Sequence, residues 1–223
     1  MNISNQLKCY GFSYFETLLW EEAKKMIDPR LHGNYRKGAI FECLIFLIFE
    51  HVISVLGLKN VIRINHNPYD RKYISREGKG LDHVIVIKKP SGIWIPIFYI
   101  EAKDWKERFM SPAVFASHVL KRFWTVVQGT KILITRGISY STKTLNKLTN
   151  NGFKLINNNY IDSIRNLIVN VTNKYNITRN KPVITPINNV ILHKPRRYPY
   201  CNTPIPNFNG LTVTKNNSIF YGG

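Results

Sequence analysis

Asp82, Glu101 and Lys103 are the residues whose types and spacing could do chemistry. They lie at the two ends of the stretch LDHVIVIKKPSGIWIPIFYIEAK, residues 81–103. Two carboxylates that face each other repel unless a positive charge lies between them. That charge comes from the lysine or from a divalent cation, and hard oxygen ligands suit Mg²⁺ or Mn²⁺. A structural ion-pair cluster gives the same pattern, so the spacing alone leaves both interpretations open.

The same stretch predicts a β-hairpin, because two apolar runs are joined by the sequence PSG, which is typical of a tight turn. If Lys89 pairs with Trp94 beside the turn, the antiparallel register places Asp82 opposite Glu101. Side chains alternate between the faces of a strand, so Lys103 shares the face of Glu101. Directly opposed Cβ atoms lie about 5 Å apart. We therefore expect the three side chains to meet at the open end of the hairpin.

The charge of the chain predicts a polyanionic partner. The 223 residues include 32 Lys and Arg against 13 Asp and Glu, a formal net charge of +19. An excess this large favours nucleic acid over an anionic membrane surface, and no helix with a Lys/Arg-rich polar face supports the membrane. The length suits one domain with an appendage, and a hydrophobic content of 44% is enough for a core.

The sequence also predicts an intracellular, cytoplasmic protein without a membrane partner. The three cysteines lie far apart and have no metal-ligand spacing, which fits a reducing compartment. Met1 to Lys8 is polar, and no apolar signal-peptide region follows it. Glu42, Glu50 and His51 interrupt the most apolar run, Ala39 to Leu58, so we do not expect a membrane-spanning helix there.

Apolar periodicity and capping signals predict further elements on both sides of the hairpin. The expected helices cover residues 12–27, 35–57, 111–127, 142–152 and 160–173, and the expected strands cover 61–64, 131–135 and 153–157. A polar loop is expected between the first strand and the hairpin. The chain then divides into an N-terminal helical segment (1–34), a domain (35–175) and a basic, Asn/Pro-rich tail or extended arm (176–223).

The order of these elements resembles the PD-(D/E)XK nuclease superfamily, whose shared core is helix, three strands, helix and strand. The residues that carry the resemblance are Gly80-Leu81-Asp82 and Glu101-Ala102-Lys103. It covers about Tyr35 to Ile156 and is strongest to archaeal Holliday-junction resolvases, Mrr-type enzymes and nucleases of archaeal viruses. It implies an α/β fold with a restriction endonuclease-like core, in which helices flank a mixed central sheet.

One position departs from the family label. Leu81 precedes Asp82 where the label has proline, and Pro68-Tyr69-Asp70 is an upstream near match. We favour Asp82, because Asp70 falls in the polar loop with no strand to hold it opposite Glu101.

The resemblance implies a metal-dependent DNA endonuclease, with Mg²⁺ or Mn²⁺ as cofactor. Asp82 and Glu101 would bind the metal together with the carbonyl of Ala102. Glu42, on the first core helix, would complete the shell directly or through water. Lys103 would orient the attacking water, help to deprotonate it and stabilise the charge on the phosphate.

Some of these roles have a structural alternative. Glu42 could equally pair with a basic residue at a helix end, and Glu50 is the other carboxylate on this helix. We expect His83 to point to the opposite face of the hairpin and pack there. His118 is expected to be a core or surface histidine rather than a base.

The basic residues expected to hold DNA phosphates are Arg71, Lys72, Arg76, Lys79, Lys106 and Arg108. Such contacts position DNA without reading its sequence. The resemblance further implies a homodimer, because cutting two strands takes two sites, and a structure-selective enzyme of DNA recombination. The alternatives are a sequence-specific restriction-type endonuclease and a non-catalytic DNA-binding protein that keeps the fold.

Overall fold

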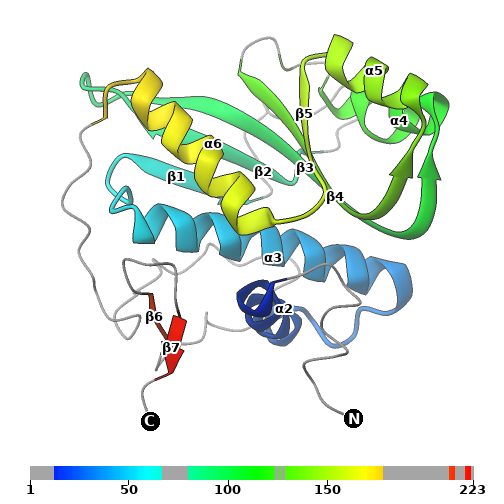
Figure 1. The fold of residues 1–223 in the computed structure, drawn as a ribbon, viewed down its shortest axis with the longest axis horizontal. Coiled ribbons are helices and arrows are strands. Elements are labelled where there is room, and N and C mark those ends of the chain that lie inside the picture. The colour runs from blue at the N-terminus through cyan, green and yellow to red at the C-terminus, as the bar shows by residue number, and fades with distance from the viewer. Residues whose placement is uncertain are drawn as a thin grey trace.

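A mixed β-sheet forms the centre of the protein (Figure 1). The computed structural model describes residues 13–66, 80–123, 126, 129–177, 211–213 and 219–221. The sheet has the order β1-β2-β3-β4-β5, in which β1 to β3 are antiparallel and β3 to β5 are parallel. The strands are β1 (Ile62–His66), β2 (His83–Lys88), β3 (Trp94–Met110), β4 (Thr130–Tyr140) and β5 (Phe153–Ile156).

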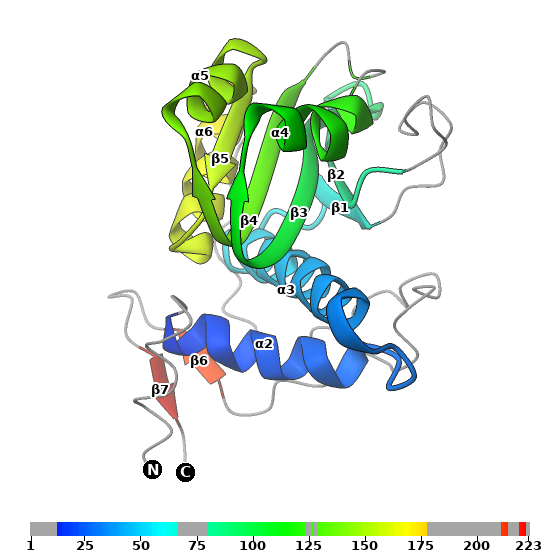
Figure 2. The same cartoon turned by 90° about the vertical axis from the view of Figure 1, so that its right-hand side faces the viewer.

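Helices cover both faces of this sheet (Figures 1 and 2). They are α2 (Tyr14–Met26), α3 (Gly33–Val55), α4 (Pro112–His118), α5 (Thr142–Asn150) and α6 (Tyr160–Lys174), with a 3₁₀-helix, η3 (Leu120–Phe123). The core beneath α2, α3 and α6 contains Ile85 and Ile87, whereas Val84 and Val86 face α4, η3 and α5. A strand buried on both faces reads as a continuous apolar run, as β2 does from Val84 to Ile87. The predicted α/β class, with a mixed central sheet flanked by helices, is confirmed.

The register of the β2–β3 hairpin is confirmed at its open end, where His83 pairs with Ile100. This is the register that places the preceding residue, Asp82, opposite Glu101. At the turn the prediction is wrong by one residue, because Lys88 rather than Lys89 pairs with Trp94.

A β-bulge reconciles the two registers. Val86 pairs with Pro96 and Ile85 with Phe98, so Ile97 is the extra residue on β3. Pro96 has no N–H to donate to the ladder, and proline within a sheet is tolerated at such irregular positions. The bulge therefore restores the expected register before the strands reach the charged end.

The helix predicted over 111–127 is shorter than expected. It ends at His118, and the chain passes through Val119 into the separate turn η3. Phe115, Val119 and Phe123 are all fully buried, so the apolar spacing of four residues continues across the break. No glycine or proline marks the break, and the apolar period gave no sign of it.

β3 and β4 are longer than predicted because they continue to pair with each other beyond Asp104 and Arg136. After an irregularity that follows Asp104, Arg108 pairs with Ile138 and Met110 with Tyr140. Ser141 then caps α5 by accepting a hydrogen bond from the backbone N–H of Thr144.

α3 is the buried central helix that the sequence predicts. By length and composition alone it could cross a membrane, but the core helix of a soluble protein meets the same criterion. Most of its residues from Ile40 to Ile53 pack in the core against the sheet, α2 and α6. The helix is weak evidence for a membrane, and the absence of a membrane partner stays a prediction.

Parts of the predicted DNA-binding surface and the tail fall outside the described residues. These parts include Arg71, Lys72, Arg76 and Lys79. In the tail, β6 (Leu211–Val213) and β7 (Ile219–Tyr221) pair as a short antiparallel ladder. The division of the chain at residues 34 and 175 stays a prediction.

Glu16 joins two helices that are far apart in the sequence. Its carboxylate accepts a hydrogen bond from the backbone of Ser13 at 2.8 Å and completes the capping box of α2. The other oxygen accepts from the backbone N–H of Ile161 at 2.9 Å, at the start of α6. The N-cap of α6, Asn159, lies in the left-handed region (φ 45°) and makes no side-chain cap of its own. Glu16 therefore supplies the cap that α6 lacks.

Substituting Glu16→Ala should lower the free energy of unfolding by about 1–3 kcal/mol, since helix caps at both ends of this contact are lost. Urea denaturation followed by circular dichroism measures the change. The control is Glu21→Ala, which removes an exposed ion pair with Lys24 on the same helix and should change stability by less than about 0.5 kcal/mol. Equal midpoints for the two variants would exclude the double cap.

Candidate active site

The open end of the hairpin brings Asp82, Glu101 and Lys103 together. Asp82 lies directly before β2, and its Oδ2 accepts a hydrogen bond from the backbone N–H of Ala102 at 2.8 Å. Lys103 Nζ contacts the carboxylate of Glu101 and lies 3.9 Å from Asp82 Oδ2. The backbone of β3 thus fixes the first carboxylate beside the second, and the two carboxylates share one ammonium.

Arg122, on η3, is a fourth member of this cluster. Its Nη1 lies 2.6 Å from Glu101 Oε1 and 3.5 Å from Asp82 Oδ1. The sequence analysis did not single it out. Its spacing of four residues from His118 would place both side chains on one side of a continuous helix, but α4 ends at His118, so the spacing alone does not locate the guanidinium.

Burial sets the electrostatics of the cluster. The side chain of Glu101 is completely buried, and its Oε2 accepts no hydrogen bond. Burial first, and the neighbouring Asp82 second, raise the pKa of Glu101 to about 7, against the opposing effect of Lys103 and Arg122. Burial acts to lower the pKa of Lys103, but Glu101 and Asp82 outweigh it and hold that pKa above its ordinary value. Lys103 is therefore a protonated hydrogen-bond donor here.

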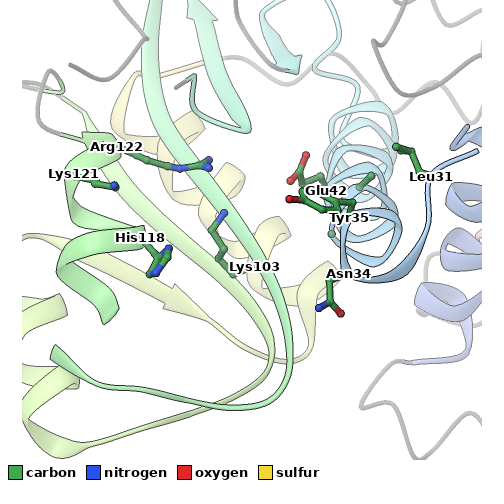
Figure 3. Close-up of a pocket in the computed structure, with 10 residues that line it drawn as sticks. Leu31, Asn34, Tyr35, Glu42, Lys103, His118, Lys121 and Arg122 are labelled. Atoms are coloured by element: carbon green, nitrogen blue, oxygen red, sulfur yellow. The ribbon is translucent and has the colours of Figure 1, made fainter. Parts of the chain in front are cut away.

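Glu42 faces the cluster from α3, across a cleft of about 470 Å³ (Figure 3). Burial, and then the charge of Asp82, raise the pKa of Glu42 well above its ordinary value. Lys103 and Arg122 act in the opposite direction. Three carboxylates thus share two cations, which leaves one excess negative charge when all are ionised.

His83 ties the helix that carries Glu42 to the strand that follows Asp82. It is fully buried, packs against the ring of Phe46 and makes a hydrogen bond with the backbone of Glu42. Burial lowers the pKa of His83 to about 3, so the ring is neutral. The expectation that His83 packs on the opposite face is confirmed. His118 lies at the end of α4 and lines the cleft.

The cluster fits a divalent cation in part. Among the described residues, no group of three or more His, Cys, Asp or Glu side chains comes close enough to hold a metal ion. Mg²⁺, however, is usually bound through one or two carboxylates and keeps several waters. Asp82 and Glu101 supply those two carboxylates, and the unbonded Oε2 of Glu101 is an oxygen that needs a partner. The roles of Glu42 and of the Ala102 carbonyl as ligands stay predictions.

Two predicted phosphate-binding residues, Lys106 and Arg108, belong to β3, but their side chains lie outside the described part of the structure. The described cations at the cleft are instead those of Lys103, Lys121 and Arg122.

Comparisons with known proteins give low similarities. No family model matches the chain, and no curated protein matches it. Among solved structures, MspJI restriction endonuclease in complex with a 27-mer oligonucleotide is 18% identical, with a TM-score of 0.36, over 75% of this chain and 38% of that chain. The DNA modification-dependent restriction endonuclease AspBHI is 14% identical, with a TM-score of 0.35, over 77% and 38%.

Protein VC1899 from Vibrio cholerae is 12% identical, with a TM-score of 0.34, over 79% of this chain and 46% of that chain. The chain spans less than half the length of each of these three structures. Sequence identities this low carry no information on the activity, substrate or partners of this chain.

The raised pKa of Glu101 predicts a pH-dependent cation affinity. Because the carboxylate must be ionised to bind, affinity for Mn²⁺ should rise about tenfold from pH 6 to pH 8, as titration calorimetry can measure. The stability of the metal-free protein should change in the opposite direction and fall as the pH rises. The pKa is above its ordinary value of 4.5, so the contribution of Glu101 to stability is full below that pH and is lost as pH rises through about 7. Both trends should become weaker in Glu101→Gln, where the raised pKa of Glu42 remains, and a pH-independent affinity in the wild type would refute the assignment.

Arg122 contacts one oxygen of each of the two carboxylates that would bind the cation. Substituting Arg122→Gln should therefore tighten Mn²⁺ binding by about tenfold, because a competing positive charge is removed. The control is Lys174→Gln, at the end of α6, which changes the net charge equally and should leave the affinity unchanged. Weaker binding in the Arg122 variant would mean that the guanidinium supports the site instead of competing for it.

Proposed function

We propose that the protein is a metal-dependent DNA endonuclease that hydrolyses phosphodiester bonds. The observation that carries this proposal is the meeting of Asp82, Glu101 and Lys103 at one hairpin end, with a buried carboxylate oxygen that has no hydrogen bond. The site opens to a cleft with cationic side chains, in a chain of net charge +19. The order α3, β1, β2, β3, α4, β4 is that of the shared core of the nuclease superfamily that the sequence resembles.

In this proposal Asp82 and Glu101 would hold Mg²⁺ together with the carbonyl of Ala102, and Glu42 would complete the set directly or through water. The bound ion would supply a water of lowered pKa and Lewis-acid stabilisation of the phosphate. Lys103 keeps its proton, so it donates hydrogen bonds that orient the attacking water and stabilise charge on the phosphate oxygens. Arg122 lines the same cleft, where its guanidinium would bind a phosphate oxygen.

Structure selectivity and a homodimer are finer parts of the proposal. The described site offers cations for phosphates, which position DNA without reading its sequence. Two sites in a symmetric dimer would suit a branched substrate with two-fold symmetry.

A second candidate is a DNA-binding protein without catalysis. The observation in its favour is that Lys103 and Arg122 already neutralise much of the charge on Asp82 and Glu101 without any metal. A site that is stable in this closed form could serve structure alone.

Substituting Asp82→Ala or Glu101→Ala should reduce cleavage to background, because each removes a metal ligand, while DNA binding persists or tightens because a negative charge is lost. Lys103→Ala should lose cleavage but keep Mn²⁺ binding. Asp162→Ala, an exposed carboxylate on α6, is the matched control and should cut at the wild-type rate.

The assay uses labelled four-way junction, flap, single-stranded and linear duplex DNA with Mg²⁺ and with EDTA, at one stated salt concentration. Preferred cutting of branched DNA supports structure selectivity, whereas cutting at one short sequence in linear DNA favours a restriction-type enzyme. Binding without cleavage of any substrate would establish the second candidate.

A further inference from the structure

Tyr35 is exposed in a way that packing does not explain. It lies on the first turn of α3, the central helix of the core, yet 85% of the residue is exposed to solvent. Together with Gly38 and Glu42 it forms one stripe of the helix, at spacings of three and four residues. The same stripe lines the cleft, and Figure 3 shows Tyr35 beside Glu42 on the side that faces Lys103 and Arg122.

Nothing in the described part of the structure explains why residue 38 is a glycine. It lies inside α3, where glycine is less stable than alanine. A Cβ atom built on Gly38 meets no other atom within 4 Å, so the residue does not make room for a neighbour in the described structure. Its backbone φ is not positive either. The open space above Gly38 belongs to the cleft, where bare backbone allows a ligand to approach closely.

The two walls of the cleft differ in chemistry. One wall, from β3, α4 and η3, carries Lys103, His118, Lys121 and Arg122. The wall formed by the start of α3 contributes Asn34, Tyr35, Gly38, Ala39 and Glu42 to the lining of the cleft, and none of these five side chains is a cation. Phosphates need the first kind of surface, and the flat face of a base needs the second. A base that is paired within a duplex is stacked on both faces and cannot offer one.

We propose that the α3 wall binds an unpaired nucleotide next to the phosphate that is held by the cationic wall. The ring of Tyr35 stacks on the base, the backbone at Gly38 lets the sugar and base lie close to the helix, and Asn34 offers an amide to the base edge. This inference rests on the proposed function and makes it narrower. The substrates are DNA molecules with an unstacked nucleotide at the cutting site, such as frayed ends, flaps or junctions.

The test uses a short single strand that contains one 2-aminopurine, in EDTA so that no cleavage occurs. Stacking on Tyr35 should quench its fluorescence. Tyr35→Ala should abolish the quench and weaken binding about fivefold or more, whereas Tyr35→Phe should retain both. Tyr175→Ala, an exposed tyrosine at the end of α6, should behave as the wild type.

Gly38→Ala gives a readout that a structural role would not. The melting temperature of the variant should rise by about 2–4 °C, because alanine favours the helix. Its affinity for the single-stranded DNA should fall by about threefold or more, because the added methyl group fills part of the cleft. Unchanged or tighter binding in Gly38→Ala, or unchanged quenching in Tyr35→Ala, would overturn the inference.

Failure of this inference differs from failure of the nuclease proposal. If the wild type cuts linear duplex as fast as frayed DNA, and Tyr35→Ala keeps that ratio, the nucleotide site is wrong and the nuclease stands. If no DNA is cut with Mg²⁺ but quenching still depends on Tyr35, the nuclease is wrong and the nucleotide site stands.

Discussion

The completely buried carboxylate of Glu101 is the constraint on which the rest of the site depends. A buried ionised group is tolerated only when charges and hydrogen bonds compensate it. Here Lys103 comes from the same strand and Arg122 from η3, while Asp82 adds repulsion from the neighbouring strand. Because Oε2 still accepts no hydrogen bond, the compensation is incomplete. Glu101 therefore keeps a raised pKa, and one of its oxygens has no hydrogen bond among the described residues.

The fold supplies this arrangement through a few long-range contacts. The backbone of Ala102 holds Asp82 in place, and His83 makes a hydrogen bond with the backbone of Glu42, which joins α3 to the hairpin. Glu16 fastens α2 to the start of α6 and thereby closes the core on the other side of α3. Hydrogen bonds outside the lining of the cleft thus connect the elements that form its walls.

The sequence predicted the parts of this structure that follow from local patterns. Alternation and the turn placed Asp82 opposite Glu101 despite a bulge that only the proline at 96 could have suggested. Arg122 was not predicted as a site residue because its position depends on the break after His118. The buried stripe of Phe115 and Phe123 continues through that break unchanged. Tertiary packing, which residue spacing does not encode, decided where the guanidinium points.

α3 shows why departures from folding preference mark the site. From Cys43 to Phe49 every residue is apolar and buried, as a core helix requires. Its first turns instead hold an exposed aromatic ring, Tyr35, a glycine without a packing role, Gly38, and a carboxylate, Glu42, whose pKa burial raises. Each of these residues weakens the isolated helix or its packing, and all three lie on the stripe that faces the cleft. Alanine would favour the helix at these exposed positions, so the three unfavourable choices on one stripe are consistent with the nucleotide site that we propose there.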